Sequence, residues 1–328
     1  MKSELLHILR CPETGARLEL ANRHGDFEEI ETGELATPDG RFVYPIRNFI
    51  PRFVPQSNYA ENFGIQWNKF RQTQLDSFSG QAISAERFWK ATGWRPVDLA
   101  GKWVLDVGCG AGRFAELALE AGANVLALDY STAADACYAN LKHFPNLHVV
   151  QGNIYALPLV KGFFPFVYSL GVLQHTPNVG RAFEALPPML APGGRLCVDF
   201  YWKRIRTMMH AKYMWRPITK RIPNTTLFRT LERIVPPLLT VSQFLGGVPL
   251  IGRFLKRLVP VADYTGLYPL SADQLSEWAL LDTFDMLAPK HDNPQTSATI
   301  RCWLQSAGLA EVEVFHERHL VGRGRRLS

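Results

Sequence analysis

The chain has 328 residues and a mass of 37.0 kDa, with 47% hydrophobic, 20% charged and 12% aromatic residues. That length exceeds a typical domain of ~100–200 residues, so it predicts either one large core with additions or two domains. The composition is that of a packed globular protein, which excludes a disordered chain, a fibrous protein and a small disulfide scaffold.

The cysteines and the N-terminal sequence favour a reducing, cytoplasmic setting. The five cysteines have no CxxC spacing, and their odd number cannot pair completely within one chain. The first residues, MKSELLHILRCPETG, contain no apolar run of signal-peptide length. The longest uncharged run, 234–252, is interrupted by Pro and Gly, so it makes a poor membrane-spanning helix.

The positive charge is concentrated in one segment. The whole chain carries a net charge of +6, but residues 203–260 contain twelve Lys or Arg and one acid, Glu232, and so carry +11. The rest of the chain is therefore acidic overall. Such a segment favours contact with an anionic partner.

A small α+β module is predicted at 1–55, with a short helix at 4–9 and strands at 41–45 and 49–54. The stretches LLHILRCPETGARLEL and RFVYPIRNFIPRFV resemble the zinc-ribbon-like domain of activators of tRNA methyltransferases. Such domains often hold zinc through a CPxC pair, but here only Cys11 remains and Thr14 takes the second position. One thiolate cannot form a four-ligand site, so we predict a module without metal.

The rest of the chain predicts a layered α/β fold. Residues 56–100 show helical spacing of aromatic residues and are interpreted as a helical lead-in. From residue 101, apolar runs such as WVLDVGC and NVLALDY alternate with amphipathic stretches, which indicates a parallel sheet covered on both faces. A helix at 296–309 and a final antiparallel strand pair should close this sheet.

A glycine-rich turn and a distant acid form the strongest functional signal. In VLDVGCGAGR, glycines follow a buried strand and let the backbone approach a ligand closely. Asp129 lies twenty-one residues after Gly108, at the end of the next strand, where a carboxylate can accept hydrogen bonds from both hydroxyls of a ribose. The pair predicts a nucleoside site.

Three details favour methyl transfer over hydride transfer. The spacing is GxGxG, whereas the dinucleotide fingerprint is GxGxxG. Asp106 precedes the turn, where a carboxylate can meet the ammonium group of an amino-acid-bearing nucleoside. Residues 192–194, Pro-Gly-Gly, turn directly into the fifth strand.

The segments VLDVGCGAGRF, ALDYS, VVQGNIYALP, VYSLGVLQHTP and APGGRL resemble, in order, the class I S-adenosylmethionine-dependent methyltransferases. The resemblance implies a doubly wound, Rossmann-like seven-stranded sheet over 101–328, in the order 3-2-1-4-5-7-6. It also implies S-adenosyl-L-methionine as the cofactor, and it places a helical lid as an insertion at 203–270.

The resemblance also assigns cofactor contacts. It places the methionine part on the residues around the glycine turn, the ribose on Asp129 and the adenine ring beside Tyr130. At Asn153 the family more often has Asp, but the amide oxygen of Asn can still accept from the adenine amine. The complete set is Asp106, Gly108, Cys109, Gly110, Asp129, Tyr130, Asn153, Ile154 and Gly171.

His175 is the candidate catalytic residue. It follows the fourth strand in GVLQHTP, at the strand ends where open sheets bind ligands, and an imidazole can take a proton from an acceptor at neutral pH. The alternative is that His175 only shapes the site, because positioning alone can drive methyl transfer. Trp67 and His291 are candidates to face the substrate, with a core helix and an ordinary loop as their alternatives.

The insertion points to the kind of acceptor. Its long apolar side chains mixed with Arg and Lys are typical of interfacial membrane helices. A lid with a solvated basic face is the alternative, and nucleic acid is disfavoured because apolar residues dominate between the charges.

We therefore expect a methyltransferase acting on a small molecule. The first choice of acceptor atom is a hydroxyl oxygen of a hydrophobic metabolite or of a glycan or lipid precursor. We also expect the protein to make peripheral membrane contact through 203–260. An RNA methyltransferase and a non-catalytic scaffold or activator remain alternatives, although LGVLQH replaces an NPPY-like tetrapeptide after the fourth strand.

Overall fold

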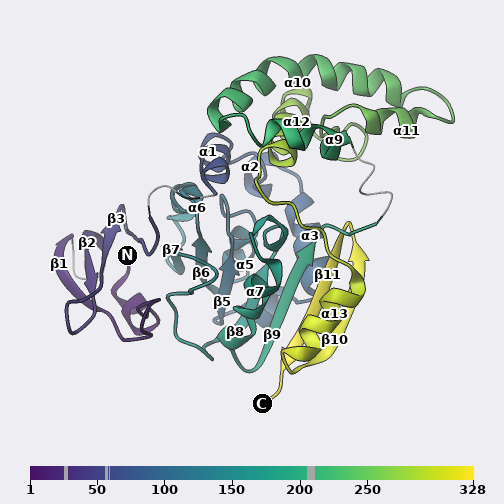
Figure 1. The fold of residues 1–328 in the computed structure, drawn as a ribbon. Coiled ribbons are helices and arrows are strands. Elements are labelled where there is room, and N and C mark those ends of the chain that lie inside the picture. The colour runs from purple at the N-terminus through teal and green to yellow at the C-terminus, as the bar shows by residue number, and fades with distance from the viewer. Residues whose placement is uncertain (26–28, 56–57, 59, 205–210) are drawn as a thin grey trace.

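A seven-stranded sheet forms the centre of the molecule in a computed structural model that describes residues 1–25, 29–55, 58, 60–204 and 211–328 (Figure 1). Its strands lie in the order β10-β11-β9-β8-β5-β6-β7. The bounds are β5 Trp103–Val107, β6 Asn124–Asp129, β7 Leu147–Gln151, β8 Phe164–Ser169, β9 Leu190–Phe200, β10 Leu309–Glu317 and β11 His319–Arg326. If β5 to β11 are renumbered 1 to 7 and the order is given from the β7 edge, it is 3-2-1-4-5-7-6, which confirms the predicted fold.

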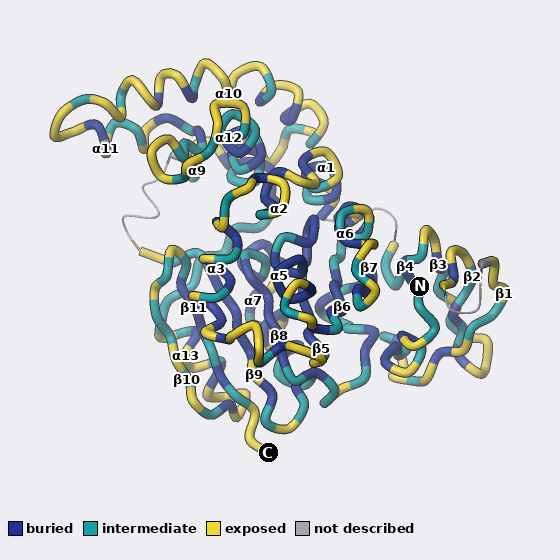
Figure 2. The backbone as a smooth tube through the Cα atoms, turned by 180° about the vertical axis from the view of Figure 1, so that it is seen from behind, coloured by how far each residue is buried: buried dark blue, intermediate teal, exposed yellow. Residues whose placement is uncertain are grey.

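The strand directions also match the prediction. β5 to β9 pair in parallel, whereas β11 runs antiparallel to both β9 and β10. β5, β6 and β7 are largely apolar and almost wholly buried because helices cover both faces, as the dark blue centre of Figure 2 shows. The carboxyl ends of β5, β6 and β8 therefore open on one edge, where a ligand can bind.

Two groups of helices cover the sheet. One face carries α3 Ile83–Thr92, α5 Ala115–Glu120 and α6 Ala133–Leu141, and the other carries α7 Val179–Glu184 and α13 Ser297–Ser306. The lead-in predicted at 56–100 contains α3 and three further helices. They are α1 Glu61–Lys69, α2 Asp76–Ser79 and α4 Pro96–Leu99.

The N-terminal module is continuous with the sheet domain. It contains the 3₁₀ helix η1 Ser3–His7 and a four-stranded antiparallel sheet, β1 Glu19–Gly25, β2 Ile30–Ala36, β3 Val43–Arg47 and β4 Ile50–Pro51. The buried Leu5 and Ile46 belong to the same apolar core as Leu105 of β5. The Phe53 amide also donates to the Gln151 carbonyl at 2.8 Å. The module is thus packed onto the β7 edge and shares its core.

The insertion is helical, as predicted, and its helices continue beyond residue 270. They are α9 Ala211–Thr219, α10 Asn224–Gly246, α11 Gly252–Leu255, η4 Lys256–Leu258 and α12 Ala272–Leu287. α12 packs Phe284 against Phe228 of α10, with ring centroids 5.3 Å apart, so both helices share one apolar cluster. Among the residues that the structure describes, no helix combines the length and apolarity needed to cross a membrane.

Candidate active site

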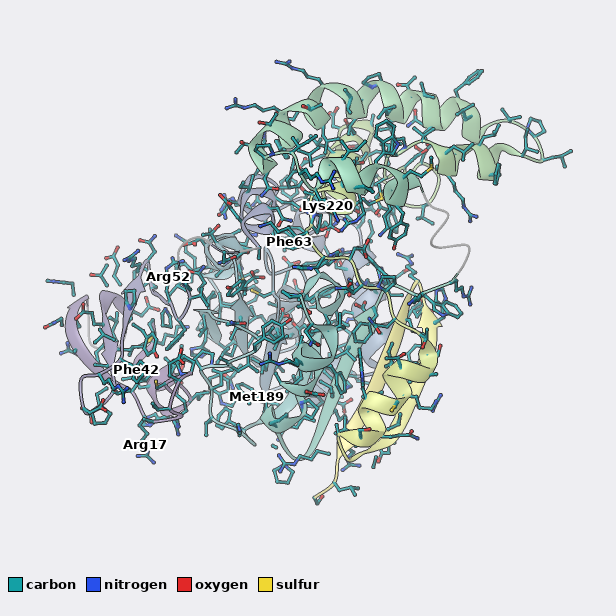
Figure 3. The ribbon with its side chains drawn as sticks, in the orientation of Figure 1. Arg17, Phe42, Arg52, Phe63, Met189 and Lys220 are labelled. Carbon is teal, nitrogen blue, oxygen red and sulfur yellow. The ribbon has the colours of Figure 1, made fainter. Side chains whose placement is uncertain are left out.

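A cavity of about 960 Å³ lies at the carboxyl ends of the parallel strands. The turns after β5, β6 and β8 form one wall, and α1, α12 and the α11–η4 region form others. Figure 3 shows Phe63, which lines the cavity, between the inserted helices and the sheet. The cavity thus joins the glycine turn to the insertion.

The glycine turn forms a cradle that larger residues would fill. Gly108 has a φ of +88°, and a Cβ there would lie 2.4 Å from the Val172 side chain. Gly110 has a φ of +53°, and a Cβ there would lie 3.3 Å from the Trp67 indole. Only glycine combines this backbone conformation with this close approach. The cradle therefore leaves space for a ligand to approach the backbone of the turn closely, as expected of the methionine part of the predicted cofactor.

Hydrogen bonds fix the orientation of the Asp129 carboxylate at the end of β6. Its Oδ1 accepts from the Ser131 amide at 2.8 Å and hydroxyl at 2.7 Å, and its Oδ2 accepts from the Gly110 amide at 3.0 Å. Burial raises the pKa of Asp129, and these hydrogen bonds oppose the rise. Asp129 lines the cavity, and a carboxylate has further lone pairs for a ribose diol. The residues present fit the cofactor.

Asp106 lies beneath the turn, outside the set of residues that line the cavity. It is 2% exposed, and its Oδ2 has no hydrogen-bond partner among the described residues. Burial raises the pKa of Asp106 to about 8, and the nearby Tyr168 hydroxyl opposes only part of that rise. Burial therefore favours the protonated form of Asp106 in the free protein, whereas the sequence suggested a carboxylate.

This buried acid should make the free protein less stable at alkaline pH. The Asp106 carboxyl ionises near pH ~4 in an unfolded chain, whereas folding raises its pKa to about 8. Its contribution to stability is fully present below the unfolded value and is lost as the pH rises towards 8. Asp106→Asn should therefore raise the melting temperature by several degrees at about pH 8.5, and by less at about pH 5.

Thermal unfolding without cofactor measures this effect, with Asp273→Asn on the exposed start of α12 as the matched control. An Asp106→Asn stabilisation that is the same at both pH values would contradict the assignment.

The cavity brings together seven of the nine predicted cofactor residues, namely Gly108, Cys109, Gly110, Asp129, Tyr130, Ile154 and Gly171. Asp106 and Asn153 are not part of its lining. The Asn153 Oδ1 instead accepts from the Tyr155 amide at 3.0 Å, within its own turn. The structure therefore gives Asn153 a local role in the backbone of the turn.

His175 lines the cavity and is only 6% exposed. Its Nδ1 lies 3.1 Å from the His291 carbonyl oxygen, which can only accept, so in the neutral ring Nδ1 carries the proton. Nε2 is then the basic nitrogen, and it is buried with no partner in the described part of the chain. The rings of Phe63 and Tyr201, both with centroids 5.4 Å away, hold the imidazole in place.

The two predicted substrate-facing residues differ in position. Trp67 lines the cavity and lies over the glycine turn at Gly110. The His291 side chain is not part of the lining, and its backbone oxygen orients His175 instead.

A wall of buried charged and aromatic groups was not anticipated from the sequence. Arg87 pairs with Asp199 at 2.7 Å, and Arg113 donates to the Gln74 amide oxygen at 2.8 Å. Burial, and then the proximity of Arg87, lowers the pKa of Arg113 to about 10. No ion pair joins Arg113 to an acid among the described residues, although Asp282 and Asp76 lie near enough to oppose part of the fall in its pKa.

The same wall contains aromatic rings and a second acid from α12 and the loop before it. Trp278 and Tyr264 line the cavity beside Asp282, and the Tyr264 hydroxyl donates to the Asp282 carboxyl. Burial raises the pKa of Asp282 to about 6. Of the wall residues, only Arg113 adjoins a sequence motif, the glycine turn, and so only it carried a signal that sequence reading could have used.

Comparison with known families agrees with this geometry. Residues 105–198 match the family described as a methyltransferase domain, and residues 2–48 match the family described as Trm112p-like protein. No group of three or more His, Cys, Asp or Glu within the described ranges is placed to hold a metal ion. That the module binds no metal remains a prediction.

Among curated relatives, the chain is similar to ubiquinone biosynthesis O-methyltransferases. It is 31% identical to that of Xanthomonas oryzae pv. oryzae (strain PXO99A), over 39% of this chain and 60% of the relative. It is 30% identical to that of Xanthomonas euvesicatoria pv. vesicatoria (strain 85-10), over 39% of this chain and 61% of the relative. The similarity thus spans about three fifths of these relatives.

Solved structures similar to this chain include magnesium protoporphyrin IX methyltransferase from Synechocystis PCC 6803 with bound SAH. The identity is 17%, the coverage is 82% of this chain and 96% of that chain, and the TM-score is 0.44. The family match and the glycine turn identify a class I S-adenosylmethionine-dependent methyltransferase domain in this chain, with S-adenosyl-L-methionine as its cofactor.

Proposed function

We propose that the protein methylates a small molecule. The preferred candidate for the acceptor atom is a hydroxyl oxygen of a hydrophobic metabolite or of a glycan or lipid precursor. The observation that carries this is a single cavity lined by the cofactor residues, by His175 and by the aromatic wall of the insertion. A volume of about 960 Å³ has room for a second molecule beside the cofactor. The curated relatives are O-methyltransferases by name, which favours oxygen.

His175 would act as the general base towards this hydroxyl. The cofactor supplies an electrophilic methyl group when bound. The His175 Nε2 is the unpartnered nitrogen, so it can accept the hydroxyl proton, while Nδ1–H remains bonded to the His291 oxygen. Because His175 is only 6% exposed, little water competes for that proton.

Arg113 and Arg87 would bind the carboxylate of the cofactor's methionine part. Both line the cavity, and the guanidinium of each lies close to the Phe114 ring, at 5.2 Å for Arg87 and 5.1 Å for Arg113. Arg87 also lies beside Gly171, one of the predicted cofactor residues, where an added Cβ would meet its Nη2 at 3.4 Å. Arg113 has hydrogen bonds to neutral side chains but no ion pair among the described residues, so it could pair with a carboxylate placed here.

Arg113→Gln should therefore weaken binding of S-adenosylhomocysteine by about tenfold or more, which corresponds to one charge-assisted hydrogen bond. Binding of 5′-methylthioadenosine, which lacks the amino-acid part, should change little. Calorimetry with both ligands gives the comparison. An equal loss for the two ligands would show that the substitution only disturbs the fold of the cavity.

An RNA acceptor is the second candidate function, because residues 2–48 match the Trm112p-like family. The same match also raises the candidate of a scaffold that engages a protein partner. Incubating the protein with a cell extract and methyl-labelled cofactor separates these possibilities. Label in organic-soluble products that survives nuclease treatment supports the small molecule, nuclease-sensitive label supports RNA, and no transfer supports the scaffold.

The basic segment 203–260 would let the protein approach an acceptor held at a membrane. Its net charge of +11 can draw it towards an anionic surface, where each charge near the surface contributes ~1 kcal/mol.

A further inference from the structure

α9 has its apolar side chains outside and its charged side chains inside. Met214, Trp215 and Ile218 are 76%, 49% and 58% exposed, and their spacing places them on one side of the helix. Lys212 and Arg216 of the same helix are buried. A helix on a water-facing surface normally shows the opposite pattern.

The inversion has a local cause at the end of α12. Arg216 donates to the carbonyl oxygens of Met286, at 2.9 Å, and Pro289, at 2.7 Å. These groups belong to the last turn of α12 and the residues after it, where free carbonyls and the helix dipole favour a cation. Lys212 pairs with the buried Asp292 at 2.8 Å. These buried bonds fix the rotation of α9, so its apolar face must point outwards.

Apolar side chains are also exposed at the rim of the cavity. Phe254, Leu258 and Leu267 line the cavity, and they are also 60%, 57% and 59% exposed. Lys212 of α9 lines the same cavity, so α9 and the α11–η4 region both contribute to its wall. Neighbouring Leu250 is fully exposed. Exposed apolar groups around an opening are typical of a surface that meets apolar material.

The charge of the insertion indicates what kind of apolar material these side chains meet. Several Lys and Arg of the insertion are exposed, namely Lys203, Arg204, Lys220, Arg221, Arg229, Arg233 and Arg257. The one acid between residues 203 and 260, Glu232, is already paired with Lys69. An insertion that exposes basic residues as well as Trp, Phe and Leu fits the interface of an anionic bilayer, where charges meet headgroups and apolar groups enter the acyl boundary.

We propose that the outer face of α9 and the α11–η4 rim contact an anionic lipid surface, and that the acceptor is a single-chain amphiphile drawn from it into the cavity. The hydroxyl end of the acceptor reaches the His175 end of the cavity, and its apolar chain remains among Phe254, Leu258 and Leu267. This inference rests on the proposed methyl transfer, and it adds the substrate class and its route of entry.

Vesicle sedimentation tests the surface. The full chain should sediment with vesicles of phosphatidylcholine and phosphatidylglycerol at low salt, and at least tenfold less with pure phosphatidylcholine or at high salt. The triple variant Met214→Gln, Trp215→Gln and Ile218→Gln should lose at least tenfold in binding. The matched control is Phe78→Gln with Val97→Gln, which alters apolar side chains that are 52% and 70% exposed outside the insertion, and it should bind like the wild type.

Two further measurements test the lipid contact of α9 and the amphiphilic acceptor separately. Brominated lipid should quench part of the tryptophan fluorescence of the wild type, and this quenching should disappear in Trp215→Phe. Titration with 4-decylphenol and phenol should show at least tenfold tighter binding of the long-chain compound, and Phe254→Asp should reduce that preference.

Calorimetry with S-adenosylhomocysteine separates this inference from the proposed function. If the nucleoside binds normally to wild type and triple variant, while anionic vesicles leave the wild type in solution, the lipid surface is refuted and the methyltransferase proposal stands. Equal affinity for phenol and 4-decylphenol would refute the amphiphile. Sedimentation with anionic vesicles that the triple variant loses and the control variant keeps supports the lipid surface. A preference for 4-decylphenol over phenol supports the amphiphilic acceptor.

Discussion

Asp129→Ala should weaken the binding of S-adenosylhomocysteine by about 100-fold or more. The Asp129 carboxylate would accept both ribose hydroxyls, and each hydrogen bond to a charged group contributes ~1.5–3 kcal/mol. The Asp129 carboxylate also accepts a hydrogen bond from the Gly110 amide, so its loss should loosen the glycine turn, which would contact the methionine part. Isothermal calorimetry of the purified chain measures the change directly.

Two control variants test the charge of Asp129 and its position separately. Asp129→Asn keeps an acceptor oxygen but removes the charge, so its loss of affinity should be intermediate. Asp273→Ala, on the exposed first turn of α12, should bind like the wild type. Unchanged affinity in Asp129→Ala, with an unchanged far-ultraviolet spectrum, would contradict the assignment of the ribose site.

His175→Ala should lower kcat by about 10²–10⁴-fold, the usual contribution of a positioned general base. The affinity for S-adenosylhomocysteine should stay within about threefold, because removing a base affects the transition state more than ligand binding. His175→Gln should lose nearly as much activity, since an amide fills part of the space but has no basic nitrogen. Steady-state kinetics with the acceptor found in the extract screen provides the measurement.

The alternative role for His175 predicts a different pattern. If the imidazole only shapes the site, His175→Gln should keep most of the activity and kcat should fall by less than about tenfold. His143→Ala, an exposed histidine after α6, gives the matched control and should be silent.

The sheet and the positions of the candidate nucleoside-binding residues were accessible from the sequence because local patterns determine them. Strands buried on both faces must be apolar, and the glycines at 108 and 110 are required by positive φ values and close packing. The twenty-one-residue spacing to Asp129 follows from the length of one strand–helix–strand unit. Such features need no knowledge of distant contacts.

The charged wall and the orientation of α9 were not accessible, because they depend on contacts between segments far apart in the chain. Arg87 meets Asp199 across 112 positions, and Arg216 meets Pro289 across 73. Nothing in the spacing of these residues marks a partner. The same reason explains the insertion, whose predicted end at 270 precedes α12, since only packing on α10 joins that helix to the others.

Asp106 shows how burial changes a role that a motif suggests. The sequence places a carboxylate before the turn, and the structure places it 2% exposed with a pKa of about 8. An acid whose pKa is raised by burial can still ionise when a cationic ligand approaches, because a nearby positive charge lowers that pKa again. The motif gave the position of this group, whereas its charge state required the tertiary structure.

The most direct measurement of the central claim is product analysis with a cofactor carrying a trideuteromethyl group. We predict one organic-soluble product that has gained a single labelled methyl group, formed in the same amount as S-adenosylhomocysteine and lost in Asp129→Ala. Formation of neither product by a chain that binds S-adenosylhomocysteine normally, across extracts that contain lipids and small metabolites, would contradict the claim that this cavity catalyses methyl transfer to a small molecule.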